Sequence, residues 1–277
     1  MHQRNVGSVS HRLTVLLGCC SLGLVLAGAL VTSNDAALSV PDWPLSWGRL
    51  VPPLEGGIRY EFAHRALAFL TAILTAMIAL RARTRLAWTA LGLVLAQAAL
   101  GGVLVRFLTP AWAAVAHACL AQLFFGTVAA MVAGGLNGKF ELRTTIAAVA
   151  LFAQTILGAA VRYGLVLLAP HIVGAAIATL MVMWAALSLL MRHMDNVALR
   201  RPAMALLTIT FSQVFLGIGA YMARVAYAAA PQPMPIMVWF SVAHVAAGSL
   251  AFAAAVMLAI AAARHAPGEV YGRMATV

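Results

Sequence analysis

The chain is a succession of long apolar runs joined by short polar or proline-containing connections. Eight runs are long enough to cross the roughly 30 Å hydrocarbon layer of a membrane as α-helices. They lie at about 12–33, 58–80, 86–107, 111–134, 142–163, 168–191, 202–226 and 236–263. No segment remains for a soluble domain, so the pattern predicts an all-α, polytopic membrane protein with eight transmembrane helices.

Composition agrees with this interpretation. Of the 277 residues, 64% are hydrophobic and only 9% are charged, which is too little polar surface for a soluble protein of this length. The first run has a cationic start, but no small-residue cleavage site follows Leu30. We therefore expect an uncleaved first helix rather than a signal peptide.

The net charge of +11 is spread over short loops, which argues against nucleic-acid binding and instead predicts an orientation. Most of the basic residues fall on one face, which the positive-inside rule makes cytoplasmic. We therefore expect a protein of the bacterial cytoplasmic membrane with both termini on the cytoplasmic side. The residues on this face are Arg4, Arg12, Arg81, Arg83, Arg85, Lys139, Arg143, Arg192, Arg200, Arg201, Arg264 and Arg273.

A short motif recurs on the third, fifth and seventh runs, each time before a run that contains a histidine. Its copies are Gln97-Ala-Ala-Leu100-Gly101, Gln154-Thr-Ile-Leu157-Gly158 and Gln213-Val-Phe-Leu216-Gly217, with a weaker copy around Gly28. A helix pair repeated four times predicts two pseudo-symmetric four-helix bundles, 1–137 and 138–277. Close helix packing by the glycines and interhelical hydrogen bonds from the glutamines remain open as simpler roles.

Four histidines, each a turn or two inside an even-numbered run, are the main candidates for chemistry. They are His64, His117, His171 and His244. An ionisable ring within lipid is costly and therefore suggests function. Histidines on facing helices can supply both axial ligands of a haem, and the two halves favour two such pairs. A zinc site is the rival interpretation, although zinc generally comes with carboxylate or thiolate ligands.

Other charged residues lie near these histidines. Arg106, Arg162 and Arg224 follow the three motifs, where they could bind haem propionates through paired hydrogen bonds or simply extend to the interface. Glu61 shares a helix face with His64, at positions i and i+3. It is a candidate catalytic carboxylate, and an i,i+4 ion pair with Arg65 is the open alternative.

The longest connection, 33–59, contains Ser39-Val-Pro41-Asp42-Trp43-Pro44. The two prolines stiffen this turn, and a loop of such length is usually functional. Asp42 and Trp43 are therefore a candidate lid, with an interfacial anchor as the alternative role for the tryptophan. The three cysteines lie within predicted helices, and we expect them to be small core residues.

The chain resembles the haem A synthase family. The resemblance rests on the 32–44 segment with Pro-Asp-Trp-Pro, on Gly48 and Pro52-Pro53, on Glu61-x-x-His64-Arg65, and on the later histidines. It implies oxidation of a ring methyl of haem O to the formyl group of haem A for a terminal oxidase. It further implies that His171 and His244 hold a haem b cofactor, that His64 and His117 form the substrate-haem pocket, and that Glu61 lies near the reacting methyl.

This chain departs from the family at one point. Many members carry a cysteine pair in the first outer loop, where this sequence has Val40 and Ser46, so a disulfide-based role in that loop lacks its residues here. The resemblance also makes the farnesyltransferase that forms haem O, terminal oxidase assembly factors and a homo-oligomer candidate partners. Two other functions stay open: a di-haem, cytochrome-b-like electron carrier, and a haem-handling chaperone or exporter.

Overall fold

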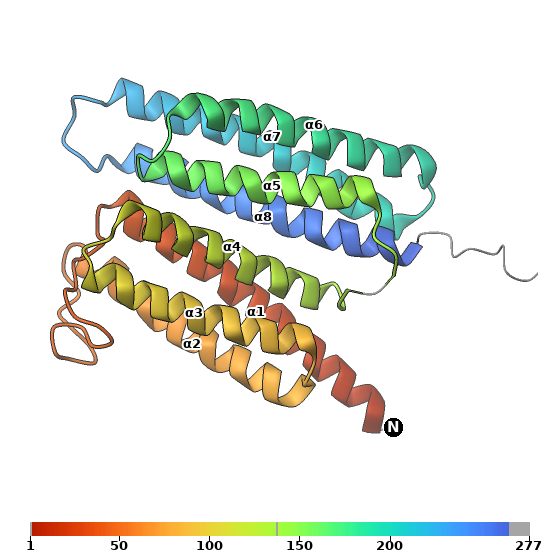
Figure 1. Cartoon of the computed structure of the whole chain (residues 1–277), viewed down its shortest axis with the longest axis horizontal. Coiled ribbons are helices and arrows are strands. Elements are labelled where there is room, and N and C mark those ends of the chain that lie inside the picture. The colour runs from red at the N-terminus through yellow and green to blue at the C-terminus, as the bar shows by residue number, and fades with distance from the viewer. Residues whose placement is uncertain (1, 137, 266–277) are drawn as a thin grey trace, which may run out of the picture.

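The computed structural model describes residues 2–136 and 138–265, and this part of the chain forms eight α-helices and no β-strand (Figure 1). Each helix is long and apolar enough to cross a membrane. The predicted class, an all-α multi-pass membrane protein, is confirmed. Residues 1, 137 and 266–277 of the two predicted halves, including Arg273, lie outside the described residues, as does the side chain of Arg4.

The helices match the predicted runs closely, except at two N-terminal ends. Their bounds are α1 (His2–Ser33), α2 (Ile58–Ala82), α3 (Arg85–Arg106), α4 (Ala111–Val132), α5 (Leu142–Arg162), α6 (Leu168–Arg192), α7 (Val197–Ala226) and α8 (Pro235–His265). Helix α7 begins before the predicted position 202 because the Asn196 side chain caps it, accepting a hydrogen bond from the Ala198 amide. Helix α1 extends through the polar residues before 12, where hydropathy gives no signal.

The helices form two groups of four, α1–α4 and α5–α8, which lie side by side (Figure 1). Helix α8 contacts both α1 and α4, and α4 contacts α5. The long α1–α2 loop and the α3–α4, α5–α6 and α7–α8 connections lie at one end of the bundle, opposite the N-terminus. All four even-numbered helices therefore start from the same end, and this brings their histidines toward that end. The arrangement is compatible with the predicted repeat.

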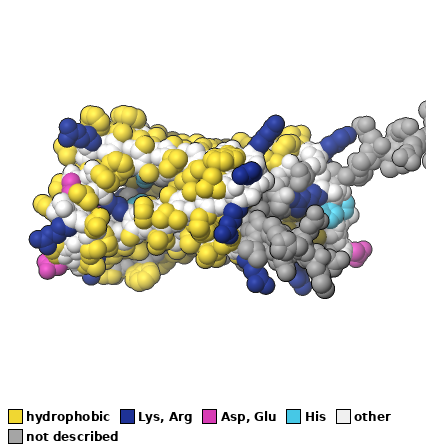
Figure 2. Space-filling view, turned by 90° about the horizontal axis from the view of Figure 1, so that it is seen from below, with side chains coloured by type: hydrophobic (Ala, Val, Ile, Leu, Met, Phe, Trp, Pro, Cys, Tyr) yellow, Lys and Arg dark blue, Asp and Glu magenta, His cyan; other side chains and the backbone are white. Residues whose placement is uncertain are grey.

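The outer surface is suited to lipid. Large apolar side chains such as Phe69, Leu180 and Phe215 are exposed, at 67%, 58% and 71%. Figure 2 shows hydrophobic side chains over the middle of one face and Lys or Arg side chains toward its ends. This is the distribution expected of helices that meet hydrocarbon in the middle and water at both ends.

Helices α4 and α8 form one part of the contact between the two groups. The Gln122 amide donates a 2.8 Å hydrogen bond to the Ser249 hydroxyl, and both side chains are buried. One turn further on, the Phe252 ring lies so close to Gly126 that a Cβ there would be 2.7 Å from ring atom Cε1. Only a residue without a side chain permits this approach.

We predict that Gly126→Ala lowers the free energy of unfolding by about 1–3 kcal/mol, because the added methyl group overpacks the contact with Phe252. The matched control is Gly92→Ala on α3, where a new Cβ meets nothing within 4 Å. This control should have little effect or raise stability slightly, since alanine favours helix. Thermal unfolding of the purified protein in detergent measures both. Equal effects of the two substitutions would contradict the claim that a methyl group at position 126 overpacks the contact with Phe252.

Candidate functional site

Each of the four histidines lies against a glycine of the preceding helix. A Cβ at Gly28, Gly101, Gly158 or Gly217 would lie 3.2, 3.5, 3.1 or 2.8 Å from Cε1 of its histidine. The four histidines concerned are, in the same order, His64, His117, His171 and His244. The glycines therefore permit close helix packing, and the group that packs against each of them is the imidazole ring of the histidine.

In the second group of helices, two of the rings meet. The centroids of His171 on α6 and His244 on α8 are 6.3 Å apart, with the ring planes at 81°. A ring nitrogen binds a metal ion at about 2 Å, so this separation suits one metal ion held between the two rings. Both side chains are half-buried, among the apolar residues of the bundle.

In the first group, His64 on α2 and His117 on α4 lie close enough to interact electrostatically. Their Nδ1 atoms are buried and have no hydrogen-bond partner. An unsatisfied buried polar atom is costly and calls for an explanation, and a bound ligand that engages the ring would supply one. Across the described ranges, no cluster of three or more His, Cys, Asp or Glu side chains could hold a metal ion.

The glutamines of the repeated motif bind the histidine residues of the next helix. The Gln97 amide donates to the His117 carbonyl at 3.0 Å, and the Gln154 amide donates to the His171 carbonyl at 2.8 Å. The Gln154 nitrogen is also 2.9 Å from Nδ1 of His171. The sequence left interhelical hydrogen bonds open as a role for the glutamines, and these bonds are formed. Each of these two glutamines bonds to the histidine of the next helix.

Glu61 forms the i,i+4 ion pair with Arg65 that the sequence left open as the alternative, at 2.6 Å. Its second carboxylate oxygen accepts a 2.9 Å hydrogen bond from the Val40 amide. Arg65 in turn donates to the backbone carbonyls of three residues of the α1–α2 loop, at 2.7, 2.9 and 3.2 Å; these are Asp42, Leu45 and Val40. The Glu61–Arg65 pair, with Glu61 buried and Arg65 partly so, thus fastens this loop, residues 34–57, to α2 one turn from His64.

The turn at the middle of the loop is closed by Asp42. Its carboxylate accepts hydrogen bonds from the amides of Trp47 and Gly48, at 2.6 and 2.7 Å. These amides, that of Gly48 above all, hold the pKa of the Asp42 carboxyl below its ordinary value. The turn carries Trp43, whose indole ring lies against Gly102 of α3: a Cβ there would be 3.1 Å from Cδ2. Gly102 is next to Gly101, which faces His117, so the loop packs on α3 beside the residue that contacts this histidine.

The three arginines predicted near propionates lie at the same end as the histidines, because they are in the last turns of α3, α5 and α7. Arg162 donates to the Thr32 carbonyl and lies 3.9 Å from the Asp35 carboxylate, which ties α5 to the end of α1. This link was not predicted from the sequence, because it joins residues 130 positions apart. No hydrogen bond of Arg106 or Arg224 is recorded within the described ranges.

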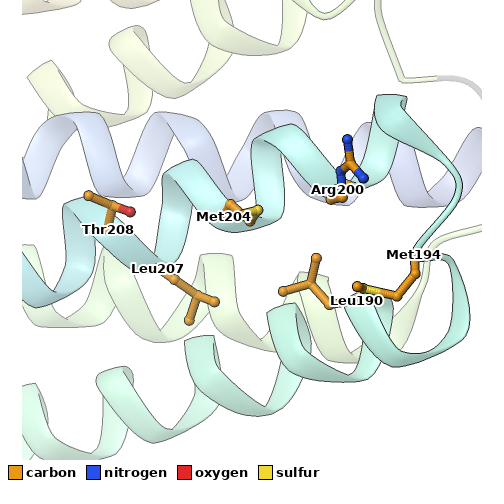
Figure 3. A pocket seen from close by; sticks show the side chains of 6 residues that line it. All are labelled: Leu190, Met194, Arg200, Met204, Leu207 and Thr208. Atoms are coloured by element: carbon orange, nitrogen blue, oxygen red, sulfur yellow. The ribbon is translucent and has the colours of Figure 1, made fainter.

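A groove of about 400 Å³ lies elsewhere, between α6 and α7 near their connection (Figure 3). Its lining is apolar apart from Arg200 and Thr208; the remaining residues are Leu190, Met194, Met204 and Leu207. It is at the opposite end of the bundle from the loops beside the histidines, and its lining contains no His, Cys, Asp or Glu. It is therefore not part of the candidate site.

Fold and site together define a multi-pass helical membrane protein with two pairs of half-buried histidines. No family model matches the chain. It is 34% identical over 146 residues to the heme A synthase of Methylobacterium radiotolerans, which covers 44% of this chain and 40% of the relative. It is 33% identical over 142 residues to that of Methylobacterium sp. strain 4-46 (43% and 39%), and 30% identical over 134 residues to that of Beijerinckia indica (40% and 37%).

These relatives confirm the resemblance of the chain to the haem A synthase family. The matched segment spans about two fifths of their length.

We predict that Arg65→Lys loosens the 34–57 loop, because an ammonium group cannot reach several carbonyls and the Glu61 carboxylate at once. Hydrogen bonds to a charged group contribute about 1.5–3 kcal/mol each, so loss of one should speed amide exchange in the loop about tenfold or more. Hydrogen–deuterium exchange measured by mass spectrometry tests this. Arg59→Lys is the control, since Arg59 donates only to the neighbouring Tyr60 hydroxyl. Unchanged exchange around Val40 in the Arg65 variant would contradict the anchoring role.

Proposed function

We propose that the protein is a haem A synthase, which oxidises a ring methyl of haem O to the formyl group of haem A. The observation that carries the proposal is the pairing of histidines within each group of helices, in a chain related to heme A synthases over part of its length. The names of the relatives support the family, and the two unlike pairs support a division into a cofactor site and a substrate site.

The pair of the second group is assigned to the cofactor. His171 and His244 would hold haem b between them, since their 6.3 Å separation accommodates one metal ion and the surrounding helices are apolar. A haem in this position supplies one-electron transfer when bound. The protein contributes the two ligands, their orientation and a water-poor environment, which together set the reduction potential.

The pair of the first group is assigned to the substrate. His64 and His117 would ligate the iron of haem O, with Asp42 and Trp43 as a lid that limits access of water from the loop side. Arg106, Arg162 and Arg224 lie at the end where propionates would emerge, and a guanidinium binds a carboxylate through two parallel hydrogen bonds. Because haem O has a long apolar tail, we propose that it enters sideways from the bilayer.

The reaction proposed on the substrate is two successive oxygenations of the methyl carbon. Each consumes one O₂, two electrons and two protons, and releases one water molecule. The first gives an alcohol, and the second gives a geminal diol that loses water to leave the aldehyde. The electrons would come from an external donor, and a haem held by His171 and His244 would supply the one-electron transfer.

Glu61 is proposed to act next to the reacting methyl, where an ionised carboxylate stabilises positive charge that develops on the substrate carbon in a water-poor site. The observed contacts give it a second task, because it also holds the Val40 amide and Arg65. These two tasks are separable, since Arg65→Lys affects the loop and leaves the carboxylate in place.

We further propose a bacterial cytoplasmic membrane location, with both termini and the larger share of basic residues on the cytoplasmic side. Both histidine pairs then lie in the outer half of the bilayer. The farnesyltransferase that makes haem O is the proposed upstream partner, and terminal oxidase assembly factors are the downstream ones.

The direct test is extraction of pigments from cells that express this chain and supply haem O, followed by mass spectrometry. We expect the formyl-bearing haem from the wild type. Glu61→Gln should stall the reaction, with the alcohol accumulating and haem still bound. Arg65→Lys is the matched control, because it loosens the loop and leaves the Glu61 carboxylate in place. Absence of any formyl product from a folded, haem-loaded wild type would favour the electron-carrier function, and full yield from Glu61→Gln would remove Glu61 from the chemistry.

A separate prediction concerns the cofactor. His171→Ala and His244→Ala should each abolish the low-spin spectrum of the tightly bound haem in the purified protein, because each removes one of the two residues that would hold it. His193→Ala, in the connection after α6, is the control and should retain that spectrum. A wild-type low-spin spectrum in either variant would mean that the resident haem is bound elsewhere.

A further inference from the structure

The groove between α6 and α7 opens at the outer surface of the bundle. Two of the residues that line it, Met194 and Met204, are exposed at 57% and 55%. Figure 3 shows Met194 next to the α6–α7 connection and Thr208 toward the middle of the helices. From Arg200 to Thr208 the groove follows α7 for eight residues, or about 12 Å. This is most of the depth of one leaflet, since the whole hydrocarbon layer is roughly 30 Å thick.

Most of the lining suits a hydrocarbon chain. Four of the six residues are apolar, and two of these four are methionines. The flexible thioether side chain of methionine adapts to partners of different shape. Because both helices are membrane-spanning candidates, the groove faces acyl chains over most of its length, and an acyl chain can fill it without leaving the leaflet.

The end of the groove beside the connection is positively charged. Arg200 lines it there and is partly buried, and within the described ranges its guanidinium has no hydrogen bond or ion pair. From Arg192 to Arg201 the sequence has three arginines against one carboxylate, that of Asp195. A guanidinium binds phosphate through two parallel hydrogen bonds. The groove therefore combines an apolar channel with a cationic group at the level where lipid headgroups lie.

We propose that this groove binds one anionic phospholipid, with an acyl chain along the apolar lining and the phosphate at Arg200. A zwitterionic lipid offers the same chain but gains less from the arginines, because its ammonium group offsets its phosphate. In the proposed orientation this end of the bundle is cytoplasmic, and anionic lipids attract basic residues on that side of a membrane. The site is separate from both histidine pairs, and its test needs neither haem nor turnover, so its outcome is independent of the proposed function.

The test titrates the purified full-length protein in detergent with phosphatidylglycerol or with phosphatidylcholine of the same acyl chains. Native mass spectrometry counts the bound lipids. We expect the wild type to retain one phosphatidylglycerol more tightly than any phosphatidylcholine. Arg200→Gln should weaken this binding about fivefold, the usual contribution of one basic residue near anionic lipid, and Arg200→Lys should keep most of it. Arg85→Gln is the matched control, since Arg85 is an exposed arginine where α3 begins, at the same end of the bundle.

A second pair of variants tests the groove itself. Met204→Trp fills the groove with a larger side chain and keeps every charge, so the tightly bound phosphatidylglycerol should be lost. Phe215→Trp, at an exposed position of the same helix, should bind like the wild type. Equal retention of the two lipids by the wild type, or equal weakening by Arg85→Gln and Arg200→Gln, would overturn the proposal. A lipid-free dimer that separates in Met204→Trp would also overturn it, because a second copy of the chain would then fill the groove.

Discussion

The structure depends on the cost of placing imidazole rings inside an apolar helical bundle. A polar ring among lipid-facing helices is tolerated only where space and hydrogen-bond partners are provided. Here the preceding helix provides the space as a glycine in all four cases, and in three of them its motif also provides a glutamine. Because each histidine is opposite a glycine, the helices of each pair approach closely at the same end of the bundle.

The two groups of helices use this common plan differently. In the second group, hydrogen bonds hold both rings, and the rings face each other at 6.3 Å. In the first group, the Glu61–Arg65 pair of α2 binds backbone groups of the 34–57 loop, and Trp43 of that loop packs on Gly102. The second pair therefore lies among helices alone, whereas the 34–57 loop packs on the first group, and this difference supports the proposed division into a cofactor site and a substrate site.

Hydropathy predicted the fold almost completely, because each crossing of the membrane requires about twenty apolar residues and the polar connections are short. It missed the start of α7, which depends on a side-chain cap by Asn196. The candidate histidines were recognisable as polar residues in apolar runs. The pairing of His171 with His244 could be proposed only from the repeat and the resemblance, since it joins distant helices. The loop contacts of Arg65 were not predictable, because local spacing reveals only its i,i+4 partner and not the three carbonyls 20 or more residues away.

The central claim is that His171 and His244 hold one haem iron between their rings. Anomalous diffraction at the iron absorption edge, from crystals of the haem-loaded protein, tests it most directly. The account predicts an iron peak between these two imidazoles, with each ring nitrogen about 2 Å away, near the end of the bundle that carries the 34–57 loop. An iron peak remote from both rings, or rings turned outward to lipid in a protein that retains its haem, would contradict it.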